Sequence, residues 1–232
     1  MANRKQSRGV CCYCGFESTK GAMTKHLLQC ESRGETIEKA NAQNPSDKNP
    51  TEMLFHLRVQ DAAYHDFWLD LEMRGSATLK KLDVYLRAIW LECCGHLSEF
   101  SGGGWGSRKI GMNQNAAKAF ADNEQITHIY DFGTSSETLV SLVAIRPGIA
   151  TTKHPIVLMS RNKMPEASCR YCEKPATHLC TGCVYEDDES GFLCEEHLVD
   201  HPHSDEYGEP VALVNSPRLG MCGYDGPADA PY

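Results

Sequence analysis

The chain has 232 residues and a formal net charge of −8, and it contains 12 cysteines and 10 histidines. No apolar run approaches the length of a membrane span, and the charged start MANRKQSRGV lacks the apolar segment of a secretory signal peptide. These features argue against membrane and secreted proteins. We therefore expect a cytoplasmic protein whose cysteines are reduced and bind metal, rather than forming disulfides.

Charge is distributed unevenly along the chain. Residues 1–34 carry a net charge of +4, residues 35–50 carry −1, residues 51–165 are neutral and residues 166–232 carry −11. The polar composition of residues 35–50 disfavours a packed core and predicts a linker. We expect an α+β fold in which a central mixed strand and helix domain (51–165) is flanked by two small zinc-stabilised modules.

The first module contains two pairs of metal-binding side chains. Cys11 and Cys14 form a CxxC knuckle, and His26 and Cys30 lie four residues apart in a predicted helix, so both face the knuckle. Residues 10–32 resemble a Cys-Cys-His-Cys variant of the ββα zinc finger, which implies one zinc ion bound by these four side chains. Cys12 could replace Cys11 in a register shifted by one residue. The expected small core consists of Phe16, Met23 and Leu27.

This segment also has a basic surface that could contact phosphates. Its basic residues are Arg4, Lys5, Arg8, Lys20, Lys25 and Arg33. One finger reads only about three base pairs, so it gives little specificity alone. Nucleic-acid contact through residues 1–34 is therefore an alternative hypothesis and not the preferred one.

The central segment shows strand and helix periodicities without metal-binding pairs. Apolar alternation predicts strands, and the spacing of leucines after Gly75 predicts a helix. The glycine-rich loop 101–106 lacks the Lys-Ser/Thr ending of a phosphate-binding loop. We expect Trp68 and Trp90 in the core. The predicted ranges are strands at 53–60 and 65–73, helices at 76–90 and 113–123, and a hairpin formed by 126–133 and 138–145.

The strings FHLRVQ, FWLDLEM, TLKKLDVYLRAIW, HLSEF and YDFG occur in that order between residues 53 and 160. They resemble the bacterial and archaeal family named for an open reading frame of an Ri plasmid, also labelled TnpR-like. The resemblance implies an α+β fold of strands around a few helices, and most members lack an assigned activity. Fuller members of the family carry a second histidine where this chain has Ser98.

Three polar residues in the family-like strings could converge as acid, base or ligand, namely His96, Glu99 and Asp131. Polar groups beside turns are commonly structural, and no nucleophile with a matched base is evident in the sequence. We therefore predict no catalytic residue. Cys222 has no knuckle partner and remains an unassigned thiol.

The C-terminal segment contains four successive ligand pairs, CRYC, CTGC, CEEH and HPH. Tetrahedral zinc takes four Cys or His ligands, so these pairs hold enough donors for two ions. His178 is an alternative ligand outside this set. The eight predicted ligands are Cys169, Cys172, Cys180, Cys183, Cys194, His197, His201 and His203.

This ordering of pairs over residues 167–205 resembles a B-box type zinc domain, a cross-braced module that binds proteins. The resemblance implies one zinc on Cys169, Cys172, Cys194 and His197, and the other on Cys180, Cys183, His201 and His203. Sequential pairing, with the first four cysteines on one ion, satisfies the same ligand count and stays open.

Four protein ligands fill each tetrahedron, which predicts structural rather than catalytic zinc, three ions in all. The charge of −11 at the C-terminal end should repel a phosphate backbone. We therefore expect a non-enzymatic zinc-binding modular protein that acts as a protein-interaction adaptor. The alternative is a nucleic-acid-linked regulator or mobile-element-associated protein that uses the basic N-terminal finger.

Overall fold

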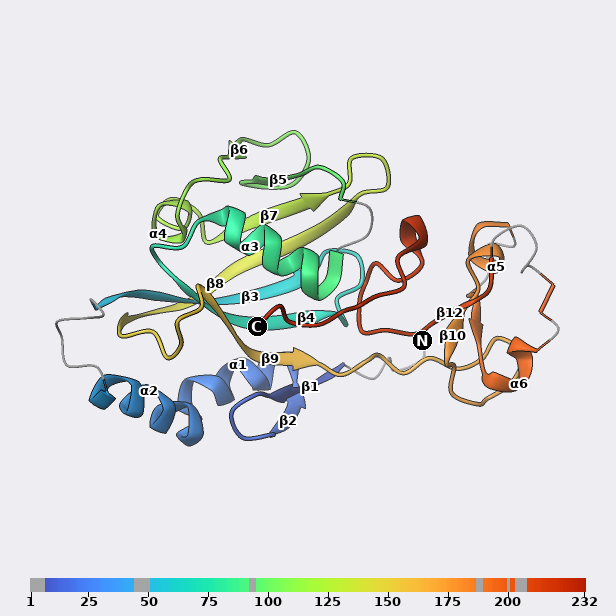
Figure 1. Ribbon diagram of the computed structural model, residues 1–232, viewed down its shortest axis with the longest axis horizontal. Coiled ribbons are helices and arrows are strands. Elements are labelled where there is room, and N and C mark those ends of the chain that lie inside the picture. The colour runs from blue at the N-terminus through green and yellow to red at the C-terminus, as the bar shows by residue number, and fades with distance from the viewer. Residues whose placement is uncertain (1–6, 44–50, 92–94, 187–189, 200, 203–207) are drawn as a thin grey trace.

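The structure, a computed structural model, describes residues 7–43, 51–91, 95–186, 190–199, 201–202 and 208–232. It confirms the predicted α+β class, with a large antiparallel sheet, helices on both of its faces and Cys/His clusters near both ends of the chain (Figure 1). No helix within these ranges is both long enough and apolar enough to cross a membrane.

The main sheet has nine strands in the order β2-β1-β9-β4-β3-β8-β7-β5-β6. The predicted strands of the central segment and its hairpin are confirmed, since β3 pairs with β4 and β7 pairs with β8. The strands are β1 (Arg8–Cys11), β2 (Glu17–Thr19), β3 (Glu52–Asp61), β4 (Trp68–Arg74), β5 (Ser98–Ser101), β6 (Lys109–Ile110), β7 (Gln125–Tyr130), β8 (Ser136–Gly148) and β9 (Ile156–Asn162).

One face of the sheet is covered by α3 (Leu79–Leu86), the π-helical turn η1 (Arg87–Leu91) and α4 (Ala116–Ala119). The predicted helix begins at Leu79, because Thr78 has an extended backbone and bridges to Asn115. The apolar side chains of α3 and η1 pack on alternate residues of β3, β4 and β8, which follows the strand period. Trp90 is fully buried in this core, and Trp68 is fully buried against the opposite helices, so both predictions are confirmed.

The opposite face of the sheet carries α1 (Lys20–Gln29) and α2 (Glu31–Gln43) (Figure 1). Part of the segment predicted as a linker is therefore helical. Residues 35–43 contain no proline, Glu31 lies in the favourable first turn, and Lys39 follows Glu35 at i,i+4 spacing. Half of residues 31–42 in α2 are exposed and only Arg33 is buried, so its polar composition is compatible with a helix that has little core of its own.

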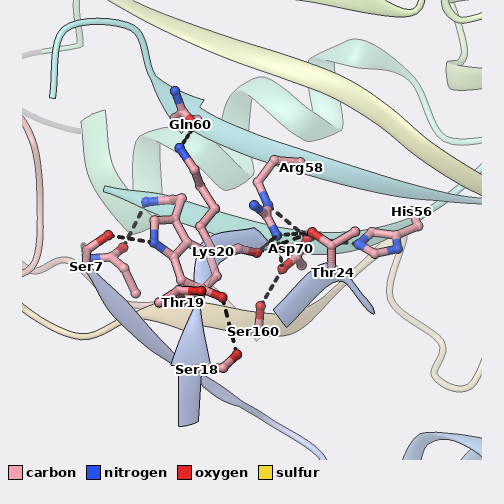
Figure 2. Close-up of polar contacts among 12 residues, drawn as sticks. Ser7, Ser18, Thr19, Lys20, Thr24, His56, Arg58, Gln60, Asp70 and Ser160 are labelled. Carbon is pink, nitrogen blue, oxygen red and sulfur yellow. Dashed lines mark hydrogen bonds and ion pairs between the residues drawn. The ribbon is translucent and has the colours of Figure 1, made fainter. Parts of the chain in front are cut away.

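A buried polar network joins this face of the sheet to α1 (Figure 2). The Arg58 guanidinium donates hydrogen bonds to both carboxylate oxygens of Asp70, at 3.0 and 2.9 Å, and also to the Thr24 hydroxyl at 2.6 Å. His56 Nε2 lies 2.8 Å from Asp70 Oδ1, and the Ser160 hydroxyl donates to Asp70 Oδ2 at 2.6 Å. Asp70 is therefore fully buried but satisfied by side chains of its two neighbouring strands, β3 and β9, and α1 is fastened to the sheet through Arg58.

A second buried carboxylate fastens α2. Glu72 accepts hydrogen bonds from Arg33 at 3.0 Å and from Arg146 at 2.9 and 2.6 Å. Although burial opposes it, these guanidinium groups hold the pKa of Glu72 below its usual value. The N-terminal segment is thus bound to the central sheet by two buried ion-pair networks.

The C-terminal module has a small sheet in the order β11-β10-β12, with two short helices. After β12 the chain returns to the central domain (Figure 1), where Asn215 and Asn162 exchange hydrogen bonds of 2.8 and 2.7 Å. Arg218 is fully buried and donates to Asp131 Oδ2 at 2.5 Å. The elements are β10 (His178–Leu179), α5 (Thr181–Glu186), β11 (Phe192–Leu193), α6 (Glu195–Leu198), β12 (Val211–Ala212) and the 3-10 turn η2 (Met221–Gly223).

A buried histidine in β7 makes stability depend on pH. His128 is fully buried with Nε2 2.8 Å from Asp83 Oδ1, and burial lowers the pKa of His128. Burial opposes ionisation of Asp83, but hydrogen bonds from His128 and Ser98 lower the pKa of Asp83 to about 2.

We expect the free energy of unfolding to fall as pH drops below about 6.5, because the unfolded state then binds a proton at His128 that the folded state does not. The contribution is at most about 1.4 kcal/mol per pH unit. Urea unfolding followed by tryptophan fluorescence between pH 5.5 and 7.5 should show a smaller slope for His128→Gln. The exposed His65→Gln is the matched control and should keep the slope of the original protein. Equal slopes in all three proteins would contradict the assignment.

Candidate metal centres

The N-terminal centre is built by the β1–β2 turn and by α1. Cys11 ends β1, and Gly15, with a φ of 74°, allows the chain to reverse after Cys14. The helix then brings His26 and Cys30 to the knuckle, and the four donor atoms lie within 4.8 Å of one another. All four predicted side chains therefore meet in one cluster.

The distances between these donors fit a tetrahedral ion. Zinc bound to thiolate sulfur and imidazole nitrogen at normal lengths places two sulfurs about 3.8 Å apart, and sulfur and nitrogen about 3.6 Å apart. The structure has 4.0 Å between the sulfurs of Cys11 and Cys30, 3.8 Å between those of Cys14 and Cys30, and 3.3 Å from Cys14 Sγ to His26 Nε2. Burial raises the pKa of Cys11 to about 12, so its thiolate requires a cation beside it.

The small core of this module differs from the prediction at one residue. Met23 and Leu27 are buried as predicted, together with Trp68 and Met159 of the central sheet. Phe16 is wrong as a core residue, since it is 46% exposed and its ring lies 4.4 Å from that of His26. Trp68 and Met159 of the central sheet, instead of Phe16, complete the core around Met23 and Leu27.

Cys12 lies outside the cluster of donors. Its thiol is exposed, and its backbone N–H donates to Met159 O at 2.9 Å, which aligns β1 with β9. A Cβ on Gly9 would approach Trp68 to 2.4 Å, so only glycine lets β1 lie this close to β4. The finger is thus an edge of the main sheet rather than a detached module.

The first C-terminal centre joins residues from the two ends of the module. Cys169 and Cys172 meet Cys194 and His197, with all donor atoms within 4.8 Å of one another. The sulfurs of Cys172 and Cys194 lie 3.8 Å apart, and His197 Nδ1 is 3.5, 3.6 and 3.3 Å from Cys169, Cys172 and Cys194. These values match the edges of a zinc tetrahedron.

Cys194 has an environment that favours its thiolate. It is the N-cap of α6, and a hydrogen bond from the backbone N–H of His197, opposed by burial of the thiol, lowers the pKa of Cys194 to about 6. A thiol at a helix start beside an imidazole ionises readily. Because metal binding requires deprotonated ligands, this sulfur is prepared for an ion at neutral pH.

The second C-terminal centre lies between α5 and the chain after α6. Cys180 and Cys183 meet His201, and Cys183 Sγ lies 3.2 Å from His201 Nε2. The Cys183 backbone N–H donates to Cys180 Sγ at 3.4 Å, as expected in a metal knuckle. His203, the predicted fourth ligand, lies outside the described residues. His178 lies outside the cluster, with Nδ1 2.9 Å from the Thr177 hydroxyl.

The structure therefore groups the C-terminal ligands in the interleaved way, with the first and third pairs together. Local knuckle spacing identified these ligands, but long-range packing decides which pairs meet. All three clusters have the donor chemistry and geometry of zinc sites. Each consists of Cys and His donors at distances suited to metal binding.

The central polar residues separate into two groups. His96 Nδ1 lies 2.8 Å from Asp131 Oδ2, so these two converge, and Cys222 joins them. Glu99 does not converge with them, because its Oε2 forms an ion pair with Lys109 Nζ at 2.5 Å. Sequence reasoning missed the contribution of Cys222 and Arg218, which lie about 90 residues from Asp131 and carry no motif.

Comparison with known proteins assigns neither a family nor a function to the chain. No protein-family model matches the chain, and no curated protein matches it. The chain is similar in structure to MM3350, a protein of unknown function from Methanosarcina mazei Go1, with 19% sequence identity and a TM-score of 0.39. The match covers 45% of this chain and 66% of the other.

Proposed function

We propose that the chain is a non-enzymatic zinc-binding adaptor that binds a protein partner through its C-terminal module. The observation that carries this proposal is a set of apolar side chains that the module leaves exposed. Tyr171, Tyr185 and Val199 are 51%, 59% and 69% exposed. Aromatic residues at a surface are typical of interfaces.

Tyr185 and Val199 lie outside the apolar core of the module, whereas the ring of Tyr171 packs against His197 and His201. Among the described residues, that core consists of Cys180, Cys183 and Leu193 with Leu198 packed against them. A core this small depends on metal coordination for its folding energy. Because residues 166–232 carry −11, the partner expected at this surface is basic and presents apolar side chains.

We also infer that residues 53–160 belong to the Ri-plasmid family and that residues 167–205 form a B-box type module. The order of strands and helices and the interleaved ligand groups support these assignments. The resemblance of the central domain to the Ri-plasmid family does not assign an activity to it.

The contacts of the N-terminal segment weigh against the nucleic-acid alternative. Arg33 is bound to Glu72, Lys20 to Gln60, and Arg8 donates to the backbone oxygen of Glu17 at 2.8 Å. These three basic groups are thus engaged by the chain itself, although Arg8, like Lys25, is exposed among the described basic residues of the segment.

A photocrosslinking amino acid placed at position 185 should capture a protein partner in cell extract. Tyr64, a tyrosine that is 52% exposed on the central domain, is the matched control position and should capture none. Capture from position 185 should be lost after Cys183→Ser, which removes a zinc ligand. Equal capture at both positions, no capture, or capture of nucleic acid would contradict the proposal.

A further inference from the structure

A fourth group of possible metal ligands lies away from the three Cys/His clusters. His96 precedes β5, Asp131 follows β7, and Cys222 belongs to η2 in the returning tail. Their donor atoms lie within 4.8 Å of one another. His96 Nδ1 is 2.8 Å and Cys222 Sγ is 3.4 Å from Asp131 Oδ2.

We propose that His96, Asp131 and Cys222 form a fourth metal site, which binds a divalent ion such as zinc and leaves one coordination position open to solvent. Nitrogen, oxygen and sulfur donors together suit a borderline ion such as zinc or cobalt. Three protein ligands with a free position distinguish this site from the N-terminal centre and the first C-terminal centre, where four protein ligands meet.

Asp131 is held in the orientation that such a site needs. Its Oδ1 accepts hydrogen bonds from the backbone N–H groups of Gly133 and Thr134, at 3.0 and 3.2 Å. Arg218 donates to Oδ2 from the buried side. A carboxylate that accepts this many hydrogen bonds stays ionised, and its oxygens are fixed as those of metal-bound carboxylates usually are.

The other two donors approach from the solvent side. The His96 side chain is 37% exposed, and Cys222 is exposed. In the present arrangement, the Cys222 thiol directs its proton at Oδ2, and His96 places Nδ1 against the same oxygen. An ion between them would take the place of these hydrogens, while Arg218, whose Nη2 lies 3.7 Å from Cys222 Sγ, stays on the buried side.

Metal binding at this site needs no oxidant, reductant or other co-reactant. Cys222 releases its thiol proton to solvent and binds as thiolate. His96 gives the Nδ1 proton to solvent and carries one on Nε2 instead, so that the neutral ring binds through Nδ1. The separation between Nδ1 and Oδ2 must widen from 2.8 Å to about 3.4 Å, and the 3.4 Å between sulfur and oxygen is close to the tetrahedral value of about 3.6 Å.

The backbone at the site supports a role beyond packing. Asp131 and Cys222, with φ values of 61° and 49°, are the non-glycine residues with left-handed backbone in the described part of the chain. Non-glycine residues adopt this conformation uncommonly, although aspartate does so more readily than most, and such positions cluster at functional sites. Both strained residues contribute a donor to the same cluster.

Arg218 sets the expected strength of the site. Its fixed positive charge lies against Asp131, and only three protein ligands are present, so the ion should bind more weakly than in the closed centres and exchange with solvent. The site should therefore lose its ion during dialysis against a weak chelator that leaves the three Cys/His clusters filled.

Cobalt(II) added to the full-length protein that holds three zinc ions tests the proposal. We expect one further equivalent to bind, with the near-ultraviolet absorption of a thiolate-to-cobalt charge transfer. Cys222→Ser should abolish that band, and His96→Gln should weaken cobalt binding at least about tenfold. Glu99→Gln, a neighbouring carboxylate outside the cluster, should change neither.

Cys222→Ser keeps a hydroxyl that can donate to Asp131, so the variant should fold, and its zinc content and thermal unfolding should match those of the original protein. With this control, absence of a further equivalent would overturn the proposal. A charge-transfer band that persists in Cys222→Ser would also overturn it, because cobalt would then be in a closed centre.

Discussion

Removal of zinc by a strong chelator should unfold the C-terminal module while the nine-stranded sheet stays folded. The module has three short strands and a core of a few side chains, whereas a structural zinc site contributes about 10–16 kcal/mol of apparent binding free energy. Hydrogen exchange followed by mass spectrometry should show loss of protection in β10, β11 and β12, with β3, β4 and β8 protected as before.

Single substitutions assign the ions to their centres. Native mass spectrometry should detect three tightly bound zinc ions in the original protein and two in Cys183→Ser. Cys12→Ser, which removes a thiol outside every cluster, should retain three. If the unmodified protein held two ions, we would infer first that the N-terminal centre lacks zinc. Protection that survives complete zinc removal would show that the module does not depend on metal.

Asp70→Ala should destabilise the central domain by about 3–5 kcal/mol. The substitution leaves the Arg58 guanidinium and the His56 ring in a buried site without their carboxylate. Because Arg58 also donates to Thr24 in α1, the N-terminal helix should lose protection in the same variant. Urea unfolding measures the first effect, and hydrogen exchange at α1 measures the second.

An exposed ion pair supplies the matched control for this loss. Glu17 and Lys163 lie 3.1 Å apart on side chains that are 44% and 54% exposed. Glu17→Ala should therefore cost no more than about 1 kcal/mol. Similar losses from Asp70→Ala and Glu17→Ala would mean that burial of the Asp70 network adds nothing to stability.

The parts of the molecule that were predictable from sequence are governed by local spacing. A CxxC turn directs two sulfurs at one point wherever it occurs, and His26 and Cys30 share a helix face because they lie four residues apart. Strand alternation in β3 and β4 likewise depends only on neighbouring residues. Each of these features depends on a short stretch of sequence and can be predicted without knowledge of the tertiary fold.

The parts that were not predictable depend on contacts between distant segments. Pairing of β1 with β9 joins residues about 150 positions apart, and it displaces Phe16 from the core of the finger. The hydrogen bonds of Asp131 with Arg218 and Cys222 span 87 and 91 positions. No periodicity in the tail marks these residues, because they act through contacts with segments that lie far away in the sequence, such as the bonds of Arg218 to Thr134, Ser136 and Asp131.

The asparagine pair at the base of the C-terminal module changes how the chain can be divided. The chain segments that enter and leave the module lie side by side at Asn162 and Asn215, which are hydrogen-bonded to each other. The module is therefore an insertion within the central domain. The central domain is consequently discontinuous in sequence, since Arg218 completes it from beyond the insertion. A chain truncated after residue 165 would lose that side chain, whereas excision of residues 164–214 with a short connecting loop would keep it.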